Sequence, residues 1–310
     1  MSIRSRGPRL LAATGALALT ALATACATTA PTTSGDSATK ITVVAAENFW
    51  GSLATQLGGD HAAVTSIITN PDTDPHDYEP TTANGRTIAG AKFVIVNGIG
   101  YDPWATNLVA ANGSASQTVL NVGQLVNVPT GGNPHRWYSP DDVEAVINQI
   151  TADYQKLDPA DSAYFADRRQ TLENHGLAQY HSLIADIKTT YAGTPIGASE
   201  SIVSPLAEGL GLNLITPSSF LDAISEGSDP TAADKATIDG QIRNKQIKIY
   251  VDNSQNSTPD VQSQVDEAKA AGIPVATVTE TLSPAGDTFQ QWQVTELQGI
   301  QKALATATGK

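Results

Sequence analysis

Two short segments bracketed by prolines carry side chains of types that can coordinate metal ions. The first is Asp74-Pro-His-Asp-Tyr-Glu-Pro80, and the second is Asn133-Pro-His-Arg-Trp-Tyr-Ser-Pro140. Each proline fixes its own φ angle and keeps the residue before it out of the helical region. His76 and His135 are therefore held on stiff, non-helical backbone. For either segment alone a solvated loop histidine is the alternative, but the presence of two such segments favours two ligands of one metal.

Strands alternating with helices predict the elements that must position these histidines. Apolar and β-branched runs indicate strands at 40–46, 63–69, 92–98, 117–122, 194–198, 212–216, 246–251 and 272–278. Helical spacing or helix-start signals indicate helices at 48–57, 81–91, 140–157, 201–210, 231–245 and 258–271, with further helices from 103 and from 287 to the end. Such alternation predicts parallel sheets flanked by helices.

A long segment without internal proline, residues 159–191, lies near the middle of the chain and contains one glycine. We interpret it as a rigid helix that separates two halves. The predicted fold class is therefore α/β, with two lobes, each a mostly parallel sheet flanked by helices, joined by one long linker helix. The expected boundaries are 40–157 for the first lobe, 158–191 for the linker helix and 192–310 for the second lobe.

Ligands in open α/β sheets bind at the carboxyl ends of the strands. His76 and His135 follow strands of the first half, while Glu200 follows one strand of the second half and Glu280 ends another. We expect the four side chains to meet in a cleft between the lobes. Imidazole and carboxylate together suit Zn, Mn or Fe, whereas Ca and Mg prefer shells made only of oxygen.

Each acidic candidate has a simpler interpretation. Glu200 begins a helix, where a carboxylate is favoured by the helix dipole alone, and Glu280 would also fit as an exposed charge at a strand end. Asp252 ends another strand and competes for the place of the fourth ligand. The polar side chains at 77–79 are candidates for orienting the His76 ring without binding the metal themselves.

The first residues indicate export. Three arginines within the first nine residues precede an apolar run at 10–25, which is too short to span a membrane comfortably and ends directly before Cys26, the only cysteine. This pattern resembles the processing site of bacterial lipoproteins, which are cut before a cysteine that then carries a lipid. We expect a lipoprotein signal peptide at 1–25, lipidation of Cys26 and a flexible tether at 26–39. An ordinary secretion signal is the alternative.

The net charge and the absence of common motifs exclude several functions. The 310-residue chain has a formal net charge of −13, which argues against binding nucleic acid because phosphate binding needs a surplus of Lys and Arg. The sequence contains no phosphate loop, dinucleotide fingerprint, nucleophile elbow or HExxH motif.

With these pieces together, the chain resembles the metal-binding lipoproteins of bacterial ABC importers, the ZnuA/TroA-like (cluster A-I) substrate-binding proteins. The resemblance runs from about Lys40 to the C-terminus. Besides the two Pro-His segments it rests on three looser matches: Asn97-Gly-Ile-Gly100 leading to Pro103-Trp104, Glu200 before a helix ending Gly209-Leu-Gly-Leu212, and Thr279-Glu280.

The resemblance implies two α/β lobes with a metal between them, held by His76, His135, Glu200 and Glu280. The family usually has Asp at the fourth position, and here the matching residue is Glu280. The His-rich insertion of many zinc-specific members is absent. Within the family a set of two histidines and two carboxylates favours manganese, but zinc binds such shells readily, so the choice between Zn and Mn stays open.

The resemblance further implies a monomeric binding protein rather than an enzyme. It would be anchored through Cys26 to the outer face of the cell membrane and would work with an ABC permease and its ATPase. The alternatives are an exported metal-dependent hydrolase and a surface adhesin with a structural metal.

Overall fold

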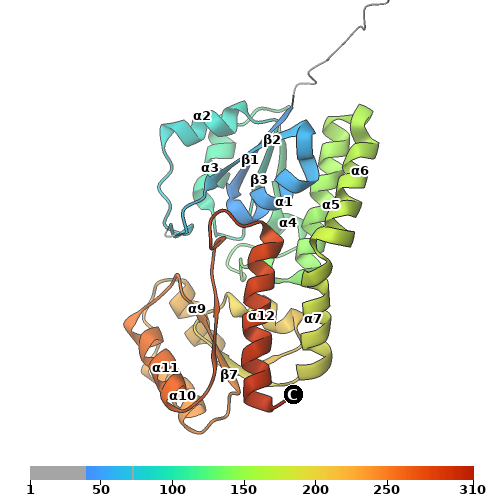
Figure 1. Ribbon diagram of the computed structural model, residues 1–310. Coiled ribbons are helices and arrows are strands. Elements are labelled where there is room, and N and C mark those ends of the chain that lie inside the picture. Colours follow the sequence, from blue (N-terminus) through green and yellow to red (C-terminus); the bar gives the residue numbers. More distant parts are fainter. Residues whose placement is uncertain (1–39, 72) are drawn as a thin grey trace, which may run out of the picture. The chain divides into compact units, whose positions relative to one another are not determined.

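The computed structural model describes residues 40–71 and 73–310 (Figure 1). The expected signal peptide, lipidated Cys26 and tether lie outside the described residues. All the described residues belong to one compact unit. Within this part of the chain, no helix is both long enough and apolar enough to cross a membrane.

The first sheet has four parallel strands in the order β2-β1-β3-β4. These strands are β1 (Ile41–Glu47), β2 (Ala62–Ile68), β3 (Phe93–Val96) and β4 (Thr118–Asn121). The helices of this half are α1 (Asn48–Gly58), η1 (Gly59–His61), α2 (Thr82–Gly90), α3 (Pro103–Asn112), α4 (Val122–Leu125), η2 (Arg136–Tyr138) and α5 (Pro140–Leu157), where η1 and η2 are 3-10 turns.

Both faces of this sheet are covered because alternate residues of its strands pack against different helices. Val43 and Ala45 of β1 belong to a core that includes buried residues of α1 and α5. Val44 and Ala46, on the opposite face, pack with residues of α2 and α3. The nearly continuous apolar runs of the sequence follow from this burial on both faces.

The second sheet repeats the plan, with parallel strands in the order β6-β5-β7-β8. Its strands are β5 (Pro195–Ala198), β6 (Asn213–Leu214), β7 (Ile249–Asn253) and β8 (Val275–Val278). Its helices are α8 (Val203–Gly209), α9 (Ser218–Ser225), α10 (Ala232–Arg243), α11 (Pro259–Ala270) and α12 (Phe289–Thr308). The predicted class, two parallel sheets flanked by helices, is confirmed. The sequence prediction lacked α9 and made β6 too long.

The segment predicted as one long helix consists of several shorter pieces. A 3-10 turn, η3 (Pro159–Asp161), leads into α6 (Ser162–Thr171), and a π-helical turn, η4 (Leu172–Gly176), separates α6 from α7 (Ala178–Tyr191). The backbone N–H of Leu177 donates to the carbonyl of Leu172 (2.7 Å), the i→i+5 bond that defines a π turn. Gly176 lies in this turn, where a Cβ would come within 2.9 Å of the Leu172 side chain.

Helix α12 runs beside α7 and contacts both α1 and β8, so the last helix of the chain packs on elements of both halves (Figure 1). The core that starts on the α1 face of the first sheet continues without a break into the second sheet. The lobe boundaries given above remain predictions.

Candidate metal centre

His76 lies in the loop that follows β2, on a turn built by its own neighbours. The Asp74 carboxylate accepts a hydrogen bond from the backbone N–H of His76 (2.8 Å), across the intervening Pro75. The imidazole is half-buried and meets the buried ring of Tyr101 edge-on, with ring centroids 4.7 Å apart. The turn and the aromatic contact together fix the direction of the ring.

His135 is fully buried, and its backbone is held in the same way, by the side chain of the residue two positions before it. The side-chain oxygen of Asn133 accepts from the backbone N–H of His135 (3.0 Å) and lies 2.9 Å from its Nδ1. With Nδ1 engaged, Nε2 is the free ring nitrogen. Burial lowers the pKa of His135 to about 4, so the ring is neutral at pH 7, as a metal ligand must be.

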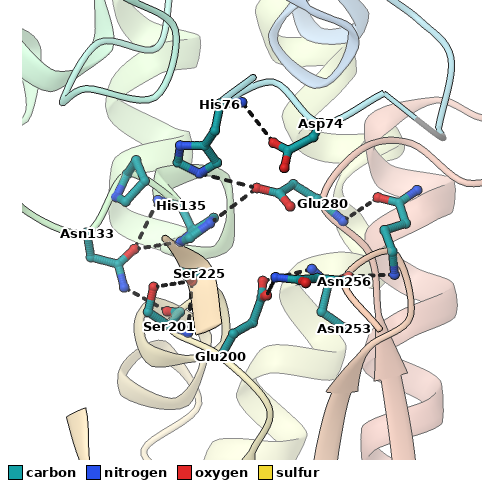
Figure 2. A network of polar contacts seen from close by, with 12 residues as sticks. Asp74, His76, Asn133, His135, Glu200, Ser201, Ser225, Asn253, Asn256 and Glu280 are labelled. Atoms are coloured by element: carbon teal, nitrogen blue, oxygen red, sulfur yellow. Dashed lines mark hydrogen bonds and ion pairs between the residues drawn. The ribbon is translucent and has the colours of Figure 1, made fainter. Parts of the chain in front are cut away.

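Glu280 reaches the two histidines from the second sheet. It lies two residues beyond β8, and the Gln255 side chain accepts hydrogen bonds from the backbone N–H groups of Glu280 (2.8 Å) and Thr281 (3.0 Å). Its Oε1 lies 3.8 Å from Nε2 of His76 and 3.4 Å from Nε2 of His135 (Figure 2). Burial raises the pKa of Glu280 to about 7.

These three atoms form a set of donors suited to one ion. They lie within 4.8 Å of one another, and each is buried without a hydrogen-bond partner among the described residues. Donors about 2.1 Å from a tetrahedral ion are about 3.4 Å apart, close to the separations from Glu280 to the histidines. Buried polar atoms without hydrogen-bond partners are unfavourable, and a single bound cation would give all three atoms a partner.

Glu200 is buried just after β5, but it is not part of this three-atom cluster. Its carboxylate accepts hydrogen bonds from the side-chain amides of Asn253 (2.7 Å) and Asn256 (2.5 Å), as Figure 2 shows. Burial, reinforced by the charge of Glu280, raises its pKa to about 7. Glu200 therefore lies close enough to interact with the centre, and its role as a ligand stays a prediction.

Asp252, the competing candidate, is placed differently. It precedes Asn253 on β7 and so projects from the opposite face of the strand. Burial raises its pKa, and the charge of Lys269 on α11 opposes that rise. The structure brings Glu280, and not Asp252, to the histidines.

The Asn97-Gly-Ile-Gly100 segment holds the backbone directly before His135 in place. The buried Asp102 carboxylate accepts from the backbone N–H groups of Asn97 (2.8 Å) and Gly98 (2.7 Å). The Asn97 amide in turn donates to the carbonyl of Pro134 (3.0 Å), directly before His135. Gly98 has φ 74°, and a Cβ there would lie 2.4 Å from Asn121, so the turn requires glycine.

Glu280 has a corresponding support on α12. The Glu296 carboxyl accepts from the backbone N–H of Thr279 (2.8 Å) and from the indole N–H of Trp292 (2.8 Å). The Tyr138 hydroxyl lies 2.5 Å from Glu296 and 2.7 Å from the carbonyl of Thr279. Tyr138 has one proton for two acceptors, so a proton on Glu296 satisfies both contacts, consistent with burial raising the pKa of Glu296 to about 8.

A water-accessible cavity of about 450 Å³ opens onto His76 and His135, and its far wall includes Asp222 and Ser225 of α9. Sequence reasoning missed these residues, and it also missed the buried Tyr101 and the amides that hold Glu200 and Glu280. One signal was available for Asn133: an Asx residue stands two positions before the histidine in both Pro-His segments.

Comparisons with known proteins agree with this fold. A family model described as "Zinc-uptake complex component A periplasmic" matches residues 43–303. A solved structure of a Mn-bound S38A mutant of a periplasmic metal-binding protein from Candidatus Liberibacter asiaticus superposes with a TM-score of 0.73 at 19% identity, covering 86% of this chain and 100% of that one. FpvC from Pseudomonas aeruginosa, in complex with Mn²⁺, gives 0.69 at 18% identity, covering 86% and 98%.

Curated relatives are also metal-binding proteins by name. The manganese-binding lipoprotein MntA of Halalkalibacterium halodurans is 25% identical over 122 residues, which is 38% of this chain and 40% of that protein. The zinc-binding lipoprotein AdcA of Streptococcus pneumoniae is 22% identical over 287 residues, 82% of this chain and 53% of that protein. The chain thus spans about half of these relatives' length or less.

Proposed function

This chain belongs to the family of periplasmic zinc-uptake components, and from that premise we propose that it captures a divalent transition metal ion, zinc or manganese, and delivers it to an ABC permease. The observation that carries the proposal is the convergence of His76, His135 and Glu280, whose three donor atoms are buried and find no hydrogen-bond partner within residues 40–71 and 73–310. The similarity to lipoproteins named for zinc and for manganese supports the same class of cargo.

In this proposal the ion is bound by Nε2 of both histidines and by the Glu280 carboxylate, with Glu200 as the fourth ligand. Asn253 and Asn256 each hold one oxygen of Glu200. One of these oxygens turns to the ion while an amide keeps hold of the other. Two imidazoles and two carboxylates form a shell that both zinc and manganese accept.

The bound ion joins the two halves of the chain. His76 and His135 follow elements of the first sheet, whereas Glu280 follows β8 of the second. An ion held by both halves fixes their relative placement, and the permease is proposed to recognise this loaded form. A cytoplasmic ATPase supplies the energy for transport, and no chemistry is done on the ion. The protein acts as a monomer held at the outer face of the membrane by a lipid on Cys26.

The binding step is tested by equilibrium competition against a chromophoric chelator with zinc and with manganese. His76→Ala should weaken binding of the tighter metal by at least about 100-fold, because one of the few donors is lost. His175→Ala is the matched control, since His175 is exposed on the π turn. Equal affinities for wild type and His76→Ala would reject the assignment.

Delivery and anchoring need separate tests. Deleting the gene from the bacterium that makes the protein should reduce uptake of radioactive zinc or manganese, and a plasmid carrying the His76→Ala chain should not restore it. Cys26→Ser should move the protein from the membrane fraction to the soluble fraction. Normal uptake in the deletion strain would contradict the importer role without bearing on metal binding.

A further inference from the structure

A second group of metal-binding side chains lies at the other end of α1 from the centre described above. Helix α1 begins at Asn48, whose side chain accepts from the backbone N–H of Leu282, two residues past Glu280. Its eleven residues extend about 16 Å to η1, which ends at His61. Here His61 meets Asp158, which precedes the 3-10 turn η3 between α5 and α6, and Asp161, which ends that turn.

The geometry of the three side chains matches that of a coordination site. Nδ1 of His61 lies 3.0 Å from a carboxylate oxygen of Asp161 and 3.9 Å from one of Asp158. All three donor atoms lie within 4.8 Å of one another. Nδ1 is itself shielded from solvent, yet it makes no hydrogen bond of acceptable geometry among the described residues. An imidazole nitrogen that lies near two carboxylates and makes no hydrogen bond would be satisfied by a cation that all three groups share.

The imidazole is also held in place. Its ring lies 4.2 Å from the ring of Tyr164 and 5.8 Å from that of Phe165, both on α6. The Tyr164 hydroxyl accepts a hydrogen bond from the backbone N–H of Asp60 (3.0 Å). The side chains of His61, Asp158 and Asp161 are 23%, 28% and 39% exposed, so the cluster is open to water. Preorganised donors lower the entropic cost of binding an ion.

We propose that His61, Asp158 and Asp161 bind a second divalent transition metal ion, independently of the centre formed by His76, His135 and Glu280. One nitrogen and two oxygens suit zinc and its neighbours of intermediate softness. Water fills the open positions, so this site is weaker than the buried one. The ion joins η1 to the start of α6, two elements far apart in the sequence.

The rival explanation is a direct contact between His61 and Asp161 alone (3.0 Å). That contact needs no metal, and Asp158 has no part in it. The two explanations differ in how many ions the chain binds and in which residues remove the weaker one.

The test is zinc binding by equilibrium dialysis on the full chain carrying Cys26→Ser, so that the single thiol takes no part. We expect two zinc ions, the second bound at least about tenfold more weakly than the first. His61→Ala and the isosteric Asp161→Asn should each remove the second ion while changing the affinity for the first by less than about twofold. An unchanged tight site also shows that these variants are folded.

His181→Ala is the matched control. His181 forms an ion pair with Glu173 (3.3 Å) and belongs to no group of three metal-binding side chains in the part of the chain that the structure describes, so its removal should leave both ions in place. In His76→Ala the weak ion should remain, which separates this proposal from the importer function. Binding of a single zinc up to about millimolar concentration, or a second ion that persists in both His61→Ala and Asp161→Asn, would overturn the proposal.

Discussion

Metal binding should release protons from the carboxylates of the centre. Burial raises the pKa of Glu280 to about 7, and Glu200 has a pKa of about 7 for the same reason, reinforced by the charge of Glu280. The two acids therefore titrate as a pair, and their apparent values belong to both. His135 is already neutral at pH 7 and contributes no proton. Because a bound ion requires the charged carboxylate, affinity falls as pH falls through 7 and levels off above it.

The size of the effect follows from these values. A carboxyl with a pKa of about 7 is about 0.9 protonated at pH 6, so the protonation of Glu280 alone makes binding there about tenfold weaker than at pH 8, or about 1.4 kcal/mol. At pH 5 the loss reaches about 100-fold. Glu280→Gln has no proton to lose at this position. Between pH 5 and 7, the slope of its logarithmic affinity against pH should therefore be smaller than that of wild type by about one.

The assay is isothermal titration of zinc at pH 6 in two buffers with different ionisation enthalpies. The difference in observed heat counts the protons released per ion. Wild type should release about 0.9 proton more than Glu280→Gln at pH 6, and the difference should vanish by pH 8.5. Parallel pH profiles for the two proteins, or equal proton counts at pH 6, would refute the placement of Glu280 at the ion.

Three further outcomes are expected. Asn133→Ala should weaken zinc binding about 10- to 100-fold, because His135 loses the group that orients its ring, and chelator competition measures this. Zinc at 100 times its dissociation constant should raise the free energy of unfolding by about 2.7 kcal/mol in wild type and far less in His76→Ala, as thermal denaturation would show. The folded-state pKa of Glu296 lies above its unfolded value, so its stabilising contribution is lost as pH rises from about 4.5 toward 8. Glu296→Gln should therefore become more stable relative to wild type by up to about 1.4 kcal/mol per pH unit from pH 5 to 7, in urea denaturation curves.

The sequence predicted most of the fold because local patterns and global burial agree. Strand β3, for example, is apolar throughout and lies in a parallel sheet covered on both faces. Pro103 and Pro140 begin helices where a missing N–H has no cost, so both helix starts were placed correctly. The two Pro-His segments were informative for the same reason, since the restricted backbone limits where each histidine points.

Other features depend on contacts that the sequence does not show. The π turn at 172–176 leaves no mark on the helical pattern of 159–191, and the close approach of Gly176 to the Leu172 side chain is visible only in the structure. Helix α9 begins at Ser218, shortly after the two-residue strand β6, and its N-cap residue Pro217 provides no side-chain cap hydrogen bond, so its start carried no clear signal. The amides of Asn253 and Asn256 reach Glu200 from a strand end and a loop, and such polar pairings become visible only when the chain is folded.

The central claim is that His76, His135 and Glu280 bind one ion together. The most direct measurement is anomalous X-ray diffraction from crystals of the zinc-loaded protein, collected at the zinc edge. We predict one strong peak about 2.0–2.2 Å from Nε2 of both histidines and from a Glu280 oxygen. A strongest peak elsewhere, or one that lacks any of these three contacts, would contradict the account.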